Sequence, residues 1–163
     1  MRGLPLALLP LLAAGAAAAA PGDSVWDHNG SLVQLYAEGQ ARTIVYLEPR
    51  PAVARAGVRP GTVLFRGRRE GDRVSGTAYT FREGCPPAPY PVSGYAAEPG
   101  RLELTGSAPV WADRSCDLAG ADPASPHASL VFRYLYREGE APGPAPALPP
   151  VPGGGQKSGP GGF

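Results

Sequence analysis

The amino-acid sequence predicts an all-β fold: a small antiparallel meander of about seven to eight strands that closes into a barrel. Segments with period-2 alternation of apolar and polar residues recur along the chain, and short polar turns join most of them. No segment shows helical periodicity over ten residues or more. An open meander of this length would expose two strand edges, so a barrel is favoured over a two-sheet sandwich.

Three hairpins account for most of the predicted strands. Each pairs two alternating segments across a turn that contains glycine. Their strands are expected at residues 31–38 with 41–48, 62–69 with 73–81, and 90–97 with 101–108. The proline-containing segment 49–61, between the first two hairpins, is expected to be a loop with room for one helical turn.

The last predicted strand, residues 129–137, has the strongest pattern. Its apolar and aromatic face consists of Leu130, Phe132, Tyr134 and Tyr136. The preceding segment, 110–126, is expected to be irregular. Four glycines inside predicted strands fit bulges or sharp bends at barrel corners. They are Gly67, Gly76, Gly94 and Gly106.

The two ends of the chain differ from the strand-rich middle. Residues 1–20 have the layout of a secretory signal: a positive charge, a short apolar run and then small residues. Cleavage is expected between Ala19 and Gly22, and the predicted location is periplasmic or secreted. Residues 21–137 form the predicted barrel-like domain, and the Pro- and Gly-rich residues 138–163 are expected to be a disordered tail.

Charge and hydropathy exclude two kinds of partner. The chain carries 15 Lys and Arg against 14 Asp and Glu, for a net charge of +1. A nearly neutral chain has no strong attraction to nucleic acid or to anionic membrane surfaces. The apolar run near the N-terminus is shorter than the roughly 20 residues of a membrane-spanning helix, and no other segment is better suited.

Cys85 and Cys116 are the two cysteines of the chain. In an oxidising compartment such a pair forms a disulfide, and this one would be worth roughly 3–4 kcal/mol on the chain-entropy model. Neither cysteine has a histidine or second cysteine at the spacing of a metal site, so no metal is predicted. The bridge is expected to hold the loop around Cys116 across one end of the barrel.

The most distinctive stretch begins at Trp26 and places Asp27, His28 and Asn29 side by side. As a functional site, it would be a cluster for proton transfer or ligand binding. The favoured alternative is local structure, in which Asn29-Gly30 makes a turn, Asp27 binds nearby backbone N–H groups and Trp26 closes the barrel end. Adjacent strand residues point to opposite faces, so Asp27 and His28 need not converge.

Hydrolytic chemistry has little support in the sequence. His28 and His127 are the two histidines, and no Gly-x-Ser-x-Gly segment is present. Arg66 and Arg68, with further arginines nearby, suggest a patch for anions or an acidic polymer. The favoured alternative for these arginines is protection of a strand edge.

Tyrosine dominates the aromatic residues of the predicted strands. A tyrosine-lined barrel mouth can hold a small ligand, and a filled core with hydroxyls at its rim fits the same pattern. The sequence leaves both arrangements open.

Several motifs resemble those of small secreted or periplasmic alphaproteobacterial proteins of unassigned function. These are the Trp-Asp-His-Asn-Gly-Ser stretch at 26–31, the segments 49–51 and 57–67, the strand 76–81, and the two cysteines. The resemblance covers most of the predicted domain and implies no catalytic residue. The architecture is also similar to that of periplasmic barrel-shaped enzyme inhibitors and lipocalin-like binders.

The predicted function is that of a non-enzymatic, exported binding or interaction module of the cell envelope. Its partner would be a small ligand, an envelope polymer or a protein, and no cofactor is expected. The chain is expected to be a monomer. The alternative is a small periplasmic enzyme or enzyme inhibitor that uses Asp27, His28 and Asn29.

Overall fold

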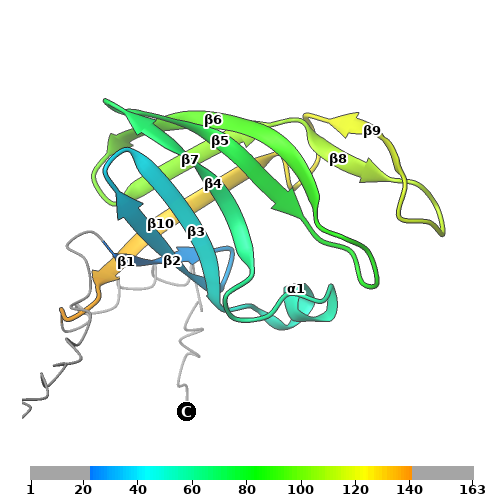
Figure 1. Ribbon diagram of the computed structural model, residues 1–163, viewed down its shortest axis with the longest axis horizontal. Helices are drawn as coiled ribbons and strands as arrows, with labels where there is room; N and C mark the ends of the chain where they lie inside the picture. Colours follow the sequence, from blue (N-terminus) through cyan, green and yellow to red (C-terminus); the bar gives the residue numbers. More distant parts are fainter. Residues whose placement is uncertain (1–22, 141–163) are drawn as a thin grey trace, which may run out of the picture.

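Eight antiparallel strands form a closed barrel in the computed structural model, which describes residues 23–140 (Figure 1). Around the barrel the order is β1-β10-β7-β6-β5-β4-β3-β2, an up-and-down meander closed by pairing of β1 with β10. The strands are β1 (Ser24–His28), β2 (Ser31–Glu38), β3 (Ala41–Glu48), β4 (Val63–Glu70), β5 (Arg73–Thr80), β6 (Ala88–Glu98), β7 (Arg101–Gly106) and β10 (Ser129–Arg137). The all-β barrel prediction is confirmed. The predicted signal segment, and the predicted tail beyond residue 140, lie outside the described residues.

Two elements stand outside the barrel wall, at the same end of it (Figure 1). Helix α1 (Pro51–Arg55) is one short turn in the loop between β3 and β4. Strands β8 (Ala108–Trp111) and β9 (Leu118–Asp122) form a separate two-stranded sheet, inserted between β7 and β10.

Two strand predictions need correction. The first predicted strand began at residue 31, but β1 precedes it and pairs with β2 on one side and β10 on the other. Five residues that include Asp27 and His28 show too little alternation to predict a strand. The segment 110–126 was predicted to be irregular, but it contains β9, whose small residues have low strand propensity and which is ordered by pairing with β8.

The barrel interior is filled at its waist. The largest side chains there, at 2 % exposure or less, are Val33, Ile44, Phe65, Leu104 and Phe132. These five residues come from five different strands and belong to one continuous hydrophobic core. The filled waist separates the space at one barrel end from the space at the other.

Glycines allow adjacent strands to approach closely in the barrel wall. A Cβ atom on Gly67 or on Gly76 would lie 2.2 Å from a backbone oxygen of the neighbouring strand, and one on Gly94 would lie 1.8 Å from such an oxygen. No side chain fits at those distances, which explains why glycine occupies these strand positions.

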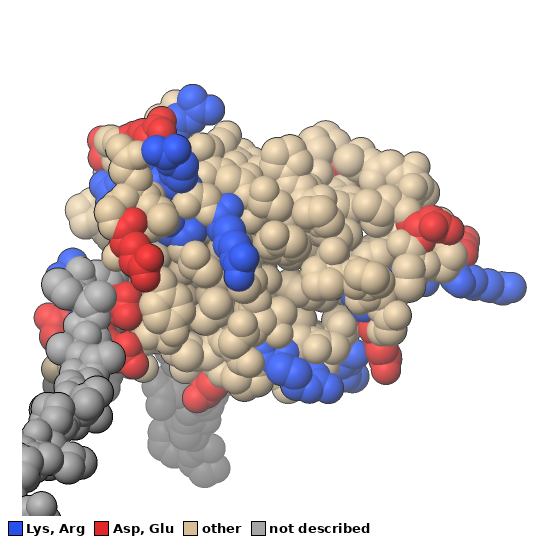
Figure 2. Space-filling model, viewed as in Figure 1, with Lys and Arg blue, Asp and Glu red and all other residues tan. Residues whose placement is uncertain are grey.

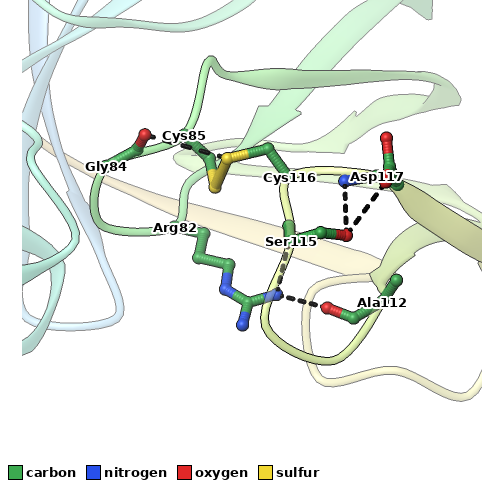
Figure 3. Close-up of a disulfide and its surroundings, with 7 residues drawn as sticks. All are labelled: Arg82, Gly84, Cys85, Ala112, Ser115, Cys116 and Asp117. Atoms are coloured by element: carbon green, nitrogen blue, oxygen red, sulfur yellow. Dashed lines mark hydrogen bonds between the residues drawn. A yellow bond between two sulfur atoms is a disulfide. The ribbon is translucent and has the colours of Figure 1, made fainter.

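The predicted disulfide is confirmed: Cys85 is bonded to Cys116, with 5.4 Å between their Cα atoms (Figure 3). It joins the loop between β5 and β6 to the turn between β8 and β9. Arg82 supports the same junction, because its Nη1 donates to the carbonyl oxygens of Ala112 and Ser115 at 2.7 and 3.1 Å (Figure 3). The disulfide indicates an oxidising compartment.

Candidate ligand pockets at the two barrel ends

A pocket of about 270 Å³ lies at the barrel end that carries α1, and we call it the polar pocket. Strand ends, α1 and the loop before β10 contribute to it. Its polar lining residues are His28, Asn29, Ser31, Tyr46, Arg50, Tyr79, Thr80, Tyr90, His127 and Ser129. None of the described residues that line this pocket is acidic.

His28 ends β1 and is buried in the wall of the polar pocket. Its Nδ1 lies 3.0 Å from the carbonyl oxygen of Val131, which can only accept, so Nδ1 carries the proton and Nε2 is left as an acceptor. The imidazole ring stacks on Phe132, with 4.8 Å between ring centroids. Burial lowers the pKa of His28 below its ordinary value of 6.5. The side chain is therefore neutral at pH 7.

Two buried tyrosines supply hydroxyl groups to the polar pocket. Burial raises the pKa of both Tyr46 and Tyr90 to about 12, so both hydroxyls keep their protons at any physiological pH. The Tyr90 hydroxyl donates to the carbonyl oxygen of His127 at 2.6 Å, which ties β6 to the loop before β10. Tyr46 packs edge-to-face on Phe81, with 6.0 Å between ring centroids.

Thr80, at the end of β5, has a buried hydroxyl that forms no hydrogen bond within the described residues. The side chain is 6 % exposed, and its Oγ1 has no hydrogen-bond partner within the described part of the chain. A buried hydroxyl without a partner costs about 1–3 kcal/mol. Less than 1 Å² of this oxygen is accessible, so a ligand in the pocket recovers the cost only when neighbouring side chains move to expose it.

Arg50 is the one arginine or lysine among the described residues that line the polar pocket, and its side chain is exposed at the rim. Its backbone N–H donates to the Ser31 Oγ at 3.0 Å, which fixes the start of the α1 loop against β2. No acidic residue of the described lining opposes this charge, so the polar pocket favours an anionic group over a cationic one.

The opposite barrel end holds a second pocket of about 450 Å³, which we call the arginine-rimmed pocket. Its principal lining residues are Trp26, Leu35, Arg42, Ile44, Phe65, Arg69, Val74, Leu102, Tyr134 and Arg137. Figure 2 shows charged side chains gathered mainly towards the ends of the barrel and around α1, with a mostly uncharged wall between them.

The residues from 26 to 29 are divided between different sites. Trp26 lines the arginine-rimmed pocket, whereas His28 and Asn29 line the polar pocket. Asp27 lines neither, and its Oδ1 accepts a hydrogen bond from the Gly30 N–H at 3.1 Å in the turn before β2. The four side chains therefore do not converge on one point.

Arg66 and Arg68 are exposed on the outer face of β4 and line neither pocket. The Arg68 guanidinium donates to the Gln40 side chain and lies 3.9 Å from the Glu70 carboxylate. These contacts are exposed ion pairs and hydrogen bonds of the kind worth at most about 1 kcal/mol. The anion patch suggested for the two arginines stays a prediction.

Residues 23–140 contain neither a cluster of metal-ligating side chains nor a helix that could span a membrane. No group of three or more His, Cys, Asp or Glu side chains in this range is arranged to hold a metal ion. In the same range no helix has the length and hydropathy to cross a bilayer.

The fold and its two pockets define a class: a disulfide-bonded, eight-stranded up-and-down barrel with a filled waist and a cavity at each end. In comparisons with known proteins, no family model, no curated protein and no solved structure matches this chain. The resemblance to small secreted alphaproteobacterial proteins stays a prediction.

His28 is expected to make the stability of the barrel depend on pH. Its folded-state pKa is below the unfolded value of 6.5, so the unfolded chain binds the proton more readily. Its contribution to stability is complete above pH 6.5 and is lost as the pH falls from there towards the lower folded-state pKa, by up to about 1.4 kcal/mol per pH unit. Asp27, Arg50 and His127 also act on this equilibrium. Urea unfolding between pH 7.5 and 5 measures the slope.

The His28→Gln variant should show a flatter dependence of unfolding free energy on pH than the wild type. His127→Gln is the matched control, because that side chain is exposed, and it should keep most of the wild-type slope. Equal slopes in the wild type and His28→Gln would contradict the prediction.

Proposed function

We propose that this chain is a non-enzymatic binding module, exported to the periplasm or beyond the cell, that holds a small organic anion in the polar pocket. The observation that carries the proposal is the described lining of this pocket, which has one arginine, several hydroxyl groups and no acidic residue. Thr80, one of the lining residues, also has a buried hydroxyl without a partner in the described chain. Buried polar groups in folded proteins almost always have hydrogen-bond partners. A ligand that displaces the neighbouring side chains would supply the missing partner.

The lining of the polar pocket suggests which ligand groups fit. Arg50 attracts a carboxylate or similar anion at the rim. Deeper in, Thr80 and Tyr46 offer hydroxyl donors, and neutral His28 offers an acceptor nitrogen. The volume of about 270 Å³ is just below the roughly 300–1,000 Å³ typical of small-molecule sites, so only a compact ligand fits. A compact carboxylate that also carries a hydroxyl or amide group matches this set.

The arrangement favours binding over catalysis. His28 donates its Nδ1 proton to a backbone carbonyl instead of a carboxylate, and Asp27 is held in a turn away from the pocket. Ser31 already accepts the Arg50 N–H. Triad chemistry needs a nucleophile, a base and a group that orients the base. In these contacts Ser31, His28 and Asp27 bond to backbone groups and not to one another.

A thermal-shift series tests the proposal with millimolar benzoate, salicylate, lactate and malate as probes. At least one should raise the melting temperature, because a ligand that binds only the folded state stabilises it. Thr80→Val and Arg50→Gln should each reduce the affinity for that probe about ten-fold, since a hydrogen bond to a charged group is worth about 1.5–3 kcal/mol.

Arg55→Gln is the matched control, because Arg55 is an exposed arginine of α1 that does not line the polar pocket. Thr80→Val also has an effect without ligand: it removes the unpartnered hydroxyl and should leave the unfolding free energy unchanged or raise it by about 1 kcal/mol. If no probe stabilises the wild type, or if Thr80→Val and Arg50→Gln respond like Arg55→Gln, the proposal is wrong.

A further inference from the structure

The arginine-rimmed pocket differs in chemistry from the polar pocket. Its floor is formed by Ile44, Phe65, Val74 and Leu102, all of them buried at 4 % exposure or less. Ile44 and Phe65 also belong to the filled waist, so the waist closes this pocket from below. The pocket lies at the barrel end with the β2–β3, β4–β5 and β6–β7 turns (Figure 1). An apolar floor favours a hydrocarbon or aromatic group over a polar one.

The walls of this pocket are aromatic. Trp26 and Tyr134 meet edge-to-face with 5.5 Å between ring centroids. The Trp26 Nε1 donates to the Ser24 Oγ at 2.7 Å, so the polar atom of the indole is already satisfied. The ring therefore adds apolar surface to the pocket and requires no polar ligand group.

Three arginines, Arg42, Arg69 and Arg137, stand at the rim, and no described residue lining this pocket is acidic. Arg42 donates from Nη1 to the carbonyl oxygens of Gly39 and Ala41 at 2.8 and 2.7 Å, which holds its guanidinium at the β2–β3 turn. Burial and the charge of Arg69 both lower the pKa of Arg42, so the two guanidinium groups are close enough to repel each other.

The carboxylates found beside this rim lie outside the pocket lining. Arg69 has one ion-pair partner, the exposed Asp72 at 3.5 Å, and such surface pairs are weak. Glu140 lies nearby, where it accepts hydrogen bonds from the Tyr134 hydroxyl and the Arg137 backbone N–H. Neither carboxylate lines the pocket, so an anion can enter between the arginines.

We infer that the barrel has a second ligand site, the arginine-rimmed pocket, which takes an amphiphilic anion with a single hydrocarbon chain. The chain lies on the apolar floor between Trp26 and Tyr134, and the anionic head contacts Arg42 and Arg137 at the rim. The volume of about 450 Å³ is within the roughly 300–1,000 Å³ typical of small-ligand sites. This site is independent of the polar pocket, because the filled waist lies between them.

Dodecanoate is the probe that tests this site, and Trp26 is the reporter. The chain has two tryptophans, so a Trp111→Phe background leaves the emission of Trp26 alone. Below its micelle concentration, dodecanoate should change this emission in a saturable way, at one molecule per chain. Decanoate, two methylenes shorter, should bind more weakly by up to about four-fold per buried methylene.

The rim is tested with paired substitutions. The double variant Arg42→Gln/Arg137→Gln should reduce the affinity for dodecanoate at least about ten-fold, because charge-assisted hydrogen bonds to the carboxylate are lost. Arg66→Gln/Arg68→Gln removes two exposed arginines from the outer face of β4 and should leave binding unchanged. Arg137→Gln alone, at an exposed strand end, serves if the double variant does not fold.

Two further variants localise the binding. Ala37→Phe places a ring in the arginine-rimmed pocket and should abolish binding, with circular dichroism confirming the fold. Thr80→Val alters only the polar pocket and should have no effect on dodecanoate.

The proposal is overturned if dodecanoate gives no saturable change in Trp26 emission, or if dodecanol binds as tightly as dodecanoate. It is also overturned if the two double-arginine variants reduce the affinity equally. Binding to anionic phospholipid vesicles without binding to monomeric dodecanoate would also overturn it, because the rim would then recognise a membrane surface.

Discussion

Replacing Phe132 by alanine is expected to destabilise the barrel by about 3–5 kcal/mol, the cost of removing a large buried aromatic side chain. Phe132 is 1 % exposed in the middle of β10 and belongs to the filled waist. The substitution also removes the ring on which the His28 imidazole stacks. Equilibrium urea unfolding at pH 7.5 measures the loss as a difference in unfolding free energy.

Phe132→Leu is the matched control, because leucine keeps most of the apolar contacts and leaves a smaller cavity, so its loss should be clearly smaller. The alanine variant should also weaken the separation between the two pockets. Dodecanoate binding, which is expected to be independent of Thr80 in the wild type, should then become sensitive to Thr80→Val. A Phe132→Ala loss below about 1 kcal/mol would show that the waist is not packed as described.

The barrel was predictable because most of its strands are local hairpins with strong alternation. The pattern around Gly39 predicts both strand ranges of the first hairpin, and residues 129–137 form one strand as expected. β1 escapes prediction because its five residues alternate weakly, and it pairs with the distant strand β10 as well as with its neighbour β2. β9 escapes because Leu118 and its neighbours are almost all exposed, and pairing with β8 orders them.

The pockets were only partly predictable, since alternation identifies the two faces of a strand without saying which is inside. In β5 the pattern groups Tyr79 with Thr77 and Phe81, but the structure buries Val74, Ala78 and Thr80 on the opposite face. The importance of Thr80 depends on this register and on the missing hydrogen bond, neither of which a sequence shows. Arg50 follows β3 in the sequence, and its place in the polar pocket depends on how the α1 loop folds back.

His28 was selected from the sequence for its neighbours, Asp27 and Asn29, but its environment comes from the opposite strand. The Val131 carbonyl fixes its tautomer, and Phe132 supplies the ring on which it stacks. Both contacts arise from the β1–β10 pairing that closes the barrel. Barrel closure thus builds the polar pocket, while the same pairing places Trp26 and Tyr134 at the other end.

Replacing Gly94 by alanine is expected to destabilise the fold by about 3 kcal/mol or more, at the upper end of overpacking effects. An added Cβ would lie 1.8 Å from the backbone oxygen of Glu103 in the adjacent strand β7. A backbone oxygen cannot rotate away as a side chain can, so β6 and β7 must separate. Separation opens the barrel and exposes two strand edges that can pair with other chains.

Guanidinium unfolding and size-exclusion chromatography test this expectation, the first for lost stability and the second for aggregation through the opened edges. Gly71→Asn is the matched control. Gly71 has a φ of +60° and no atom within 4 Å of an added Cβ, and asparagine tolerates that conformation, so its cost should stay within about 0.5 kcal/mol. If Gly94→Ala also cost no more than about 0.5 kcal/mol of unfolding free energy, β6 and β7 would not approach as closely as described.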